Sequence, residues 1–231
     1  MAGLIIAFSG VESSGKSTQI DLLLDHLKSQ ECKPIYLWTR PGYTPLMSAA
    51  KRTLRGLSGR RKAASEEGVS EKPGQYPKRA GSFRSSIKRR MWLTVSLADL
   101  FWTYCIYLRL LRLRGRTVLL DRYLMDAIVD FRVNFPDQQV DRGIAFRLVR
   151  RFAAKSAAAY CLLIPAKESI KRTQSRARQH WEVPEIVEQK ESLYRTLADE
   201  VGAIVIDGCQ SPESIGEQLR QDVDKLLDSR R

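Results

Sequence analysis

The chain contains 231 residues, of which 43% are hydrophobic, and it carries a formal net charge of +13. The hydrophobic content excludes a disordered chain, and the even spread of the apolar residues argues against a membrane protein. The charge is uneven, because residues 51–90 hold thirteen Lys and Arg against three Glu, a local charge of +10, while the rest of the chain adds only +3. An evenly basic chain would indicate a nucleic-acid binder, so this distribution predicts no nucleic-acid partner.

The N-terminal residues and the cysteines predict a cytoplasmic protein. The N-terminus lacks the basic start and the cleavage site of a signal peptide, and its short apolar run leads straight into a glycine-containing loop. The four cysteines, which are Cys32, Cys105, Cys161 and Cys209, are scattered without a CxxC pair, and the chain has only two histidines. We therefore expect free thiols in a reducing environment and no metal cluster.

Five short apolar runs predict β-strands. Each is continuously apolar, which is how strands read when helices cover both faces of a parallel sheet. Helical patterns separate the runs, so the sequence predicts one α/β domain over residues 1–231 with a doubly wound, five-stranded parallel sheet. The predicted strands are Leu4–Phe8, Pro34–Trp38, Thr117–Leu120, Tyr160–Ile164 and Ala203–Ile206.

This alternation of strands and helices fails between Arg55 and Ser86, where Gly, Ser, Pro, Lys and Arg dominate. Such a segment buries too little apolar surface to offset the entropy of ordering it, so we predict a basic, mobile insertion at about residues 56–86. A solvated loop is the simplest interpretation. Attraction of an anionic substrate, or contact with membrane lipid through this basic segment, are the alternatives.

The segment Met91–Leu111 is the most apolar part of the chain, and its length is close to that of a membrane span. However, Asp99 and Arg109 lie inside it, and three further arginines follow at once. These charges favour a core helix, one face of which could form the seam of a homodimer.

A phosphate-binding loop is the strongest signal in the sequence. Residues 10–17 read GVESSGKS, which fits the pattern GxxxxGK[ST], and they lie between a predicted strand and a helical pattern that runs from Thr18 to about Lys28. Glycines let successive backbone N–H groups point at phosphate oxygens, and the following helix N-terminus adds the positive end of its dipole.

This loop predicts ATP and Mg²⁺ as cofactors. Lys16 can reach the β- and γ-phosphates, while the Ser17 hydroxyl can ligate Mg²⁺. The predicted cofactor-binding residues are Gly10, Ser13, Ser14, Gly15, Lys16, Ser17 and Thr18.

Asp121 supplies a second predicted metal ligand. It ends the apolar run Val118–Asp121, the pattern of a Walker-B strand, whose carboxyl end faces the same crevice as the phosphate-binding loop in a doubly wound sheet. An N-cap role for Asp121 in the next helix is the alternative.

From these residues outward, the chain resembles the thymidylate kinases, which are nucleoside-monophosphate kinases of the P-loop NTPase fold. The resemblance rests on Phe8–Thr18, on Thr39–Leu46, which is similar to TREPGGTPL, and on Asp121–Tyr123, which matches the DR-Y/H segment. It implies that ATP phosphorylates a small-molecule acceptor. It also implies an acceptor site formed by Glu12, Arg40, Arg122 and Tyr123.

The resemblance further implies a lid at about residues 170–183 that closes over ATP, because Lys171–Arg178 falls where the family has its arginine-bearing lid. Arg172 and Arg176 are four residues apart and can share one helix face. With Lys16 and Asp121 they form the predicted catalytic set, whereas a solvated helix face is the alternative for the two arginines.

The acceptor side departs from the family pattern. Leu100 falls where the family has an arginine, Ser96 lies near the place of its base-stacking ring, and Tyr43 replaces a glycine. Asp126 and Phe131 change the polar residues that follow the DR-Y/H segment.

Three functions therefore stay open. The first is a kinase of nucleoside monophosphates, with thymidylate as the first candidate. The second is the same chemistry on another small molecule, with Asp126 or Asp130 as a general base, although exposed helix carboxylates are the simpler interpretation. The third is a non-catalytic ATP-binding protein.

Overall fold

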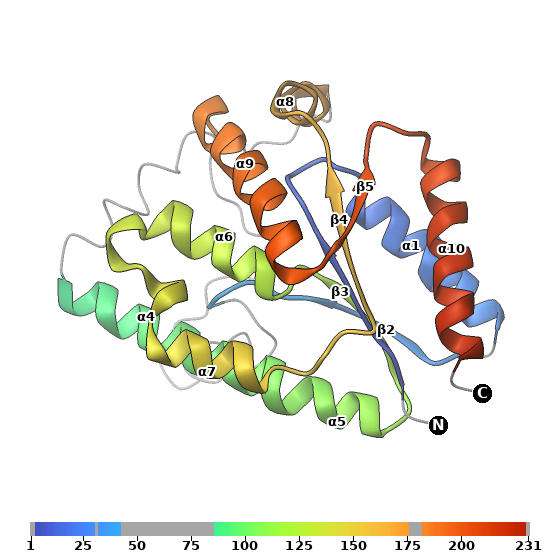
Figure 1. Cartoon of the computed structure of the whole chain (residues 1–231), viewed down its shortest axis with the longest axis horizontal. Helices are drawn as coiled ribbons and strands as arrows, with labels where there is room; N and C mark the ends of the chain where they lie inside the picture. The colour runs from blue at the N-terminus through green and yellow to red at the C-terminus, as the bar shows by residue number, and fades with distance from the viewer. Residues whose placement is uncertain (1–2, 31, 43–85, 176–181, 230–231) are drawn as a thin grey trace, which may run out of the picture.

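The computed structural model describes residues 3–30, 32–42, 86–175 and 182–229, which form one parallel sheet between two layers of helices (Figure 1). The strands are β1 (Ile5–Ser9), β2 (Pro34–Trp38), β3 (Thr117–Asp121), β4 (Ala158–Leu163) and β5 (Ile204–Asp207). All pair in parallel, in the order β2-β3-β1-β4-β5. This topology confirms the predicted fold class, a doubly wound five-stranded sheet of the P-loop NTPase type.

The helices follow the strands in alternation. They are α1 (Lys16–Ser29), α4 (Ser86–Phe101), the π-helix η1 (Trp102–Tyr107), α5 (Leu108–Leu113), α6 (Leu124–Asn134), α7 (Ile144–Phe152), α8 (Ala166–Ser175), α9 (Pro184–Val201) and α10 (Pro212–Asp228). Two short 3-10 turns, η2 (Pro136–Gln138) and η3 (Val140–Arg142), connect α6 to α7.

The sheet register aligns the strand ends that matter for function. Phe8 of β1 pairs with Asp121 of β3, and Trp38 of β2 pairs with the same Asp121 from the other side. Because all the strands run in one direction, their carboxyl ends meet at one edge of the sheet. This edge carries the loop that follows β1.

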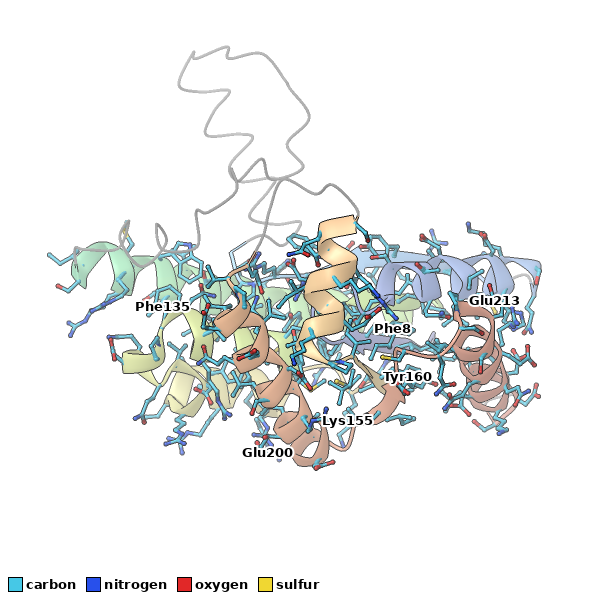
Figure 2. All side chains as sticks on the ribbon, turned by 90° about the horizontal axis from the view of Figure 1, so that it is seen from above. Phe8, Phe135, Lys155, Tyr160, Glu200 and Glu213 are labelled. Atoms are coloured by element: carbon cyan, nitrogen blue, oxygen red, sulfur yellow. The ribbon has the colours of Figure 1, made fainter. Side chains whose placement is uncertain are left out.

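The continuous apolar runs are explained by helices on both faces of the sheet. Ile5 and Ala7 point into the layer of α4–α7 and α9, whereas Ile6 and Phe8 point into the layer of α1 and α10. On the second face Phe8 stacks on Tyr160 of the adjacent strand, with ring centroids 5.5 Å apart (Figure 2). The edge strands are less covered: Tyr36 in β2 is 46% exposed and Val205 in β5 is 48% exposed.

The apolar segment predicted as a core helix is a single helical stretch across α4, η1 and α5. One face, which includes Leu100, Tyr104 and Leu108, is buried against the sheet. The stretch Arg89–Leu113 is long and apolar enough to cross a membrane by length and composition alone, but 44% of its most apolar window is buried inside the fold. A core helix passes the same test, and the buried face supports that interpretation.

Several predictions lie wholly or partly outside the described residues. They include most of the insertion at about residues 56–86, of which only Ser86 is described; it begins α4 and is therefore not part of a loop. They also include Tyr43 and the lid residues Arg176 and Arg178. All four cysteines are described, and all are free thiols as predicted.

Candidate active site

The loop of residues 10–15 joins β1 to α1 at the carboxyl edge of the sheet. Gly10 has a φ of 136°, and a Cβ at this position would lie 2.2 Å from the carbonyl oxygen of Leu162, so only glycine fits. Gly15 precedes Lys16, the first helical residue, and provides no side-chain cap for the start of α1. Helix starts that lack such a cap, with their N–H groups in a glycine-containing turn, are suited to bind anions.

Lys16 folds back onto the loop that precedes it. Its Nζ donates hydrogen bonds to the carbonyl oxygens of Gly10 (3.0 Å) and Val11 (2.6 Å) and to the Oγ of Ser14 (3.1 Å). Burial, followed by the charge of Arg122, lowers the pKa of Lys16 from 10.5 to about 8. An anion in the loop would offset this lowering and stabilise the ammonium form.

Asp121 has one carboxylate oxygen engaged and one without a donor. Its Oδ2 accepts a hydrogen bond of 3.1 Å from the hydroxyl of Tyr36. Burial, followed by the charge of Asp121, raises the pKa of Tyr36, so this hydroxyl remains a donor. The Oδ1 of Asp121 is buried and has no hydrogen-bond partner among the described residues. The N-cap of α6 is Tyr123, so the alternative N-cap role for Asp121 is wrong.

A buried carboxylate oxygen without a donor is a position that a hard cation such as Mg²⁺ would satisfy. Asp121 and the Ser17 hydroxyl line the same cavity, so the residues present fit the predicted ion. Within the described part of the chain, no group of three His, Cys, Asp or Glu could hold a metal. Phosphate and water oxygens would therefore have to complete its coordination.

Arg122 is held at the start of α6 by a buried carboxylate. It has a φ of 77°, in the left-handed region, and its Nη1 lies 3.6 Å from the Oδ1 of Asp126. Asp126 also accepts hydrogen bonds from the hydroxyls of Ser9 (2.6 Å) and Tyr194 (2.7 Å) and from the backbone N–H of Tyr123 (3.0 Å). Asp126 is therefore a buried, saturated acceptor and not an exposed helix carboxylate.

Arg40 forms a second arginine–carboxylate pair with Asp130. Its Nη2 lies 3.0 Å from Oδ1, and its Nε lies 3.5 Å from Oδ2. Burial alone would raise the pKa of Asp130, but the charges of Arg40 and Lys190 outweigh it and hold the pKa below its ordinary value. Because Asp130 is also shielded from solvent, the exposed-carboxylate interpretation is wrong for it too.

The loop, Asp121 and the two arginines Arg40 and Arg122 open onto one cavity of about 320 Å³. Of the predicted site residues that the structure describes, it brings together all except Gly10, Tyr123 and Arg172. Its lining residues are Glu12, Ser13, Ser14, Gly15, Lys16, Ser17, Thr18, Tyr36, Trp38, Arg40, Asp121 and Arg122.

The helix α8 is tied to the loop at two points. The Ser169 hydroxyl donates to the carbonyl oxygen of Glu12 (2.8 Å), and the hydroxyls of Thr173 and Ser13 lie 2.9 Å apart. Ser13 has a φ of 57°, which is unusual for a residue with a Cβ. The described part of the predicted lid is therefore in contact with the loop.

Arg172 is turned toward the loop that follows β5. Its Nε donates to Glu168 (2.7 Å), and its Nη1 donates to the carbonyl oxygen of Gly208 (2.9 Å). It does not line the cavity. Its predicted helical partner, Arg176, lies outside the described residues.

Tyr123, a predicted acceptor-site residue, packs in the core instead. Its ring lies edge-on to Tyr104, and its hydroxyl donates to the carbonyl oxygen of Ala154 (2.6 Å). Conversely, the sequence interpretation missed Tyr36 and Trp38, which line the cavity. Trp38 ends the predicted strand Pro34–Trp38, and Tyr36 lies two residues before it on the same face, so the carboxyl end of this strand could have identified both.

Comparison with known proteins gives a local similarity. No protein-family model matches the chain. A stretch of 61 residues is 46% identical to the thymidylate kinase of Symbiobacterium thermophilum; the match covers 24% of this chain and 28% of that protein. This partial match supports, at most, a kinase of that family.

Proposed function

We propose that the protein is a phosphotransferase that moves the γ-phosphoryl group of ATP to a nucleoside monophosphate, with thymidylate as the first candidate. The observation that carries the proposal is the single cavity shared by Lys16, Asp121, Arg40 and Arg122. Phosphoryl transfer requires mainly positioning and cationic stabilisation of the phosphate oxygens, and these residues can supply both. The partial match to a thymidylate kinase supports the same class of reaction.

On the donor side, the N–H groups of the loop and of the first turn of α1 would bind the triphosphate. Lys16 would exchange its bonds to Gly10, Val11 and Ser14 for phosphate oxygens. Ser17 and Asp121 would hold Mg²⁺, which neutralises charge on the phosphates when it is bound. Binding of ATP is thus an exchange of hydrogen bonds that the loop already makes.

On the acceptor side, Arg122 and Arg40 would hold the acceptor phosphate. Each guanidinium is oriented by a carboxylate, Asp126 or Asp130, so little side-chain entropy remains to be lost on binding. Glu12 lies 3.9 Å from Arg122 and could accept a hydrogen bond from the acceptor. Arg172 would contribute only after leaving Glu168 and Gly208, with which it is now bonded.

The arginine–carboxylate pairs also favour a second candidate, which is the same chemistry on a less anionic acceptor. Asp126 and Asp130 already compensate much of the positive charge that a phosphate dianion would need. Neither acts as the general base in this version, because Asp126 accepts three hydrogen bonds and Asp130 has a lowered pKa.

The test is an ADP-release assay with Mg²⁺–ATP against a panel of nucleoside monophosphates and small hydroxylated metabolites. Turnover with thymidylate at about 1–100 per second would support the first candidate. Turnover with a hydroxylated metabolite and not with nucleotides would support the second. If no acceptor in the panel leads to release of ADP, although the protein binds ATP tightly, both candidates would be contradicted. That result would indicate a non-catalytic ATP-binding protein.

A matched pair of variants shows whether activity comes from this cavity. Lys16→Ala should abolish transfer and leave the fold intact, which circular dichroism can verify. Lys28→Ala, an exposed lysine at the far end of α1, should keep the wild-type rate. Equal rates in wild type and Lys16→Ala would refute the assignment of the cavity.

A further inference from the structure

Two helical segments expose apolar and cationic side chains on the same side of the molecule. They are residues 101–116, which include η1 and α5, and residues 142–157, which include α7. We call their exposed side chains the basic apolar face. In Figure 1, α5 and α7 run along the lower edge of the molecule, whereas α8, next to the candidate site, lies at the opposite edge.

The two segments form one continuous surface. The guanidinium of Arg109 donates to the carbonyl oxygen of Phe152 (2.9 Å), and the thiol of Cys105 lies 3.6 Å from the carbonyl oxygen of Val149. The N–H of Ala154 donates to the carbonyl oxygen of Tyr104 (2.8 Å). The outward side chains of both helices therefore border each other.

Seven large apolar side chains are exposed on this face. Leu113 is 72% exposed and Ile144 is 70% exposed. Ile144, Leu148 and Phe152 are spaced four residues apart, so they form a stripe along α7. The exposed large apolar residues of the face are Phe101, Trp102, Leu110, Leu113, Ile144, Leu148 and Phe152.

The charged part of the face has one sign only. The two segments contain nine Lys and Arg and no Asp or Glu. Glu200 of α9 is at the margin, where it shares the wall of a small cavity with Arg150 and lies on the same side as Lys155 in Figure 2. The exposed cationic residues are Arg109, Arg114, Arg142, Arg147, Arg150, Arg151 and Lys155, and Arg112 and Arg116 are partly exposed.

We infer that the basic apolar face docks this protein on an anionic phospholipid surface. Helices that lie in a membrane interface combine Trp, Phe and Leu, which enter the headgroup region, with Arg and Lys, which attract anionic lipids. The helices do not cross the bilayer, because Leu100, Tyr104 and Leu108 on the other side are part of the core. The protein therefore binds peripherally.

The charge and the apolar residues of this face favour an anionic lipid surface over a second copy of the chain and over a nucleic acid. In a symmetric dimer a face meets its own copy, so the arginines of one chain would oppose those of the other without an acid between them. A nucleic acid would complement the arginines, but it would leave Leu113, Ile144 and Leu148 without an apolar partner. An anionic bilayer complements both the charges and the apolar stripe.

The orientation keeps the candidate site accessible. The Ser169 hydroxyl of α8 donates to the carbonyl oxygen of Glu12 in the loop, and α8 lies at the edge opposite α5 and α7, so this loop would lie away from the lipid surface (Figure 1). Soluble substrates would reach it from the aqueous side. We therefore expect vesicles to bind the protein without changing its activity.

The test is co-sedimentation of the full chain with vesicles of phosphatidylcholine and phosphatidylserine (7:3) at physiological salt, against vesicles of phosphatidylcholine alone. The triple variant Arg114→Ala/Arg147→Ala/Arg151→Ala should bind the anionic vesicles about 100-fold more weakly. Leu113→Gln/Ile144→Gln should lose at least about 10-fold, because the apolar contribution is removed.

Matched control variants replace residues of the same kinds outside the basic apolar face. Lys28→Ala/Arg195→Ala/Lys225→Ala removes equal charge from exposed positions on α1, α9 and α10, and Leu22→Gln changes an exposed apolar residue of α1. These variants should bind as the wild type does. Equal losses in the control and face variants would overturn the inference, as would unchanged binding of both face variants.

Tryptophan fluorescence tests the same inference with single substitutions. The wild-type protein should show a blue-shifted tryptophan emission with anionic vesicles, and Trp102→Phe should lose this shift while Trp92→Phe keeps it. Three results would overturn the inference: no vesicle binding at physiological salt, binding of nucleic acid in place of vesicles through the same arginines, or a dimer dissociated by Leu113→Gln/Ile144→Gln with no vesicle binding.

Discussion

Arg122 and Asp126, four residues apart in the sequence, form an ion pair in which the Nη1 of the arginine lies 3.6 Å from the Oδ1 of the aspartate. The aspartate cannot follow the arginine if it moves, because Ser9, Tyr123 and Tyr194 donate three further hydrogen bonds to it. Asp126 is thus a positioning residue that fixes the guanidinium at the cavity.

Asp126→Asn should raise the KM for the acceptor by at least about 10-fold, because a misplaced guanidinium loses its hydrogen bonds to the acceptor. The KM for ATP should change by less than about 2-fold, since no hydrogen bond or ion pair of Asp126 involves the loop residues that would bind ATP. We also expect a loss of about 2–3 kcal/mol in the free energy of unfolding. Steady-state kinetics with each substrate varied in turn measures the first two effects.

The control for this variant is Asp141→Asn, which breaks a comparable arginine pair away from the cavity. Asp141 is 8% exposed, and its Oδ2 lies 2.9 Å from the Nε of Arg132. It should lose stability but keep both KM values. If the two variants raised the acceptor KM equally, the positioning role of Asp126 would be refuted.

The lowered pKa of Lys16 predicts a pH-dependent contribution to stability. Its folded-state pKa of about 8 lies below the ordinary value of 10.5, so between these values the unfolded chain binds more protons than the folded one. The stability of the wild type relative to Lys16→Met should therefore rise with pH from about 8 to about 10, by up to about 1.4 kcal/mol per pH unit. Urea unfolding of both proteins at pH 7, 8.5 and 9.5 checks the slope, and a flat difference would contradict it.

Asp121 should control the Mg²⁺ requirement of the reaction. Asp121→Asn removes the charge that would hold the ion, so the Mg²⁺ concentration for half-maximal rate should rise by at least about 10-fold. Tyr36→Phe removes only the donor to Oδ2 and should shift this concentration by less than about 3-fold. A magnesium titration at saturating ATP separates the two, and a wild-type requirement in Asp121→Asn would exclude it as a ligand.

The left-handed backbone of Ser13 predicts an order among substitutions. Ser13→Gly and Ser13→Ala both lose the hydrogen bond to Thr173, but glycine adopts a φ of 57° without strain. Ser13→Gly should therefore be more stable than Ser13→Ala by about 1–2 kcal/mol in thermal or urea unfolding. At Ser192, an exposed residue inside α9, the order should reverse, with alanine above glycine by about 0.5–1 kcal/mol. The same order at both positions would refute the strain at Ser13.

The strands could be predicted because their chemistry is local. Ile5, Ile6, Ala7 and Phe8 are all apolar since each meets a helical layer on its own side of the sheet, and a run of this kind is visible without knowing the layers. The phosphate-loop motif is local too, because a strand, a glycine turn and a helix follow one another directly.

The acceptor side could not be predicted in the same way. Asp126 resembles an exposed helix residue in the sequence, yet Ser9, 117 residues earlier, and Tyr194, 68 residues later, bury and saturate it. The resemblance to the DR-Y/H segment predicts Tyr123 at the site together with Arg122, but only Arg122 lines the cavity. At Arg122 the chain changes direction, and the next side chain turns into the core against Tyr104 and Ala154.

The pairing of Asp121 with Phe8 on one side and with Trp38 on the other fixes where the Asp121 carboxylate lies relative to the phosphate-binding loop. Successive side chains of a strand alternate between faces, so a slip of a single residue in either ladder would turn the carboxylate away from the phosphate loop. A misaligned but otherwise well-packed form of this chain could not keep the candidate site assembled. Pairing β1, β2 and β3 in the correct alignment and assembling the candidate site are therefore a single event.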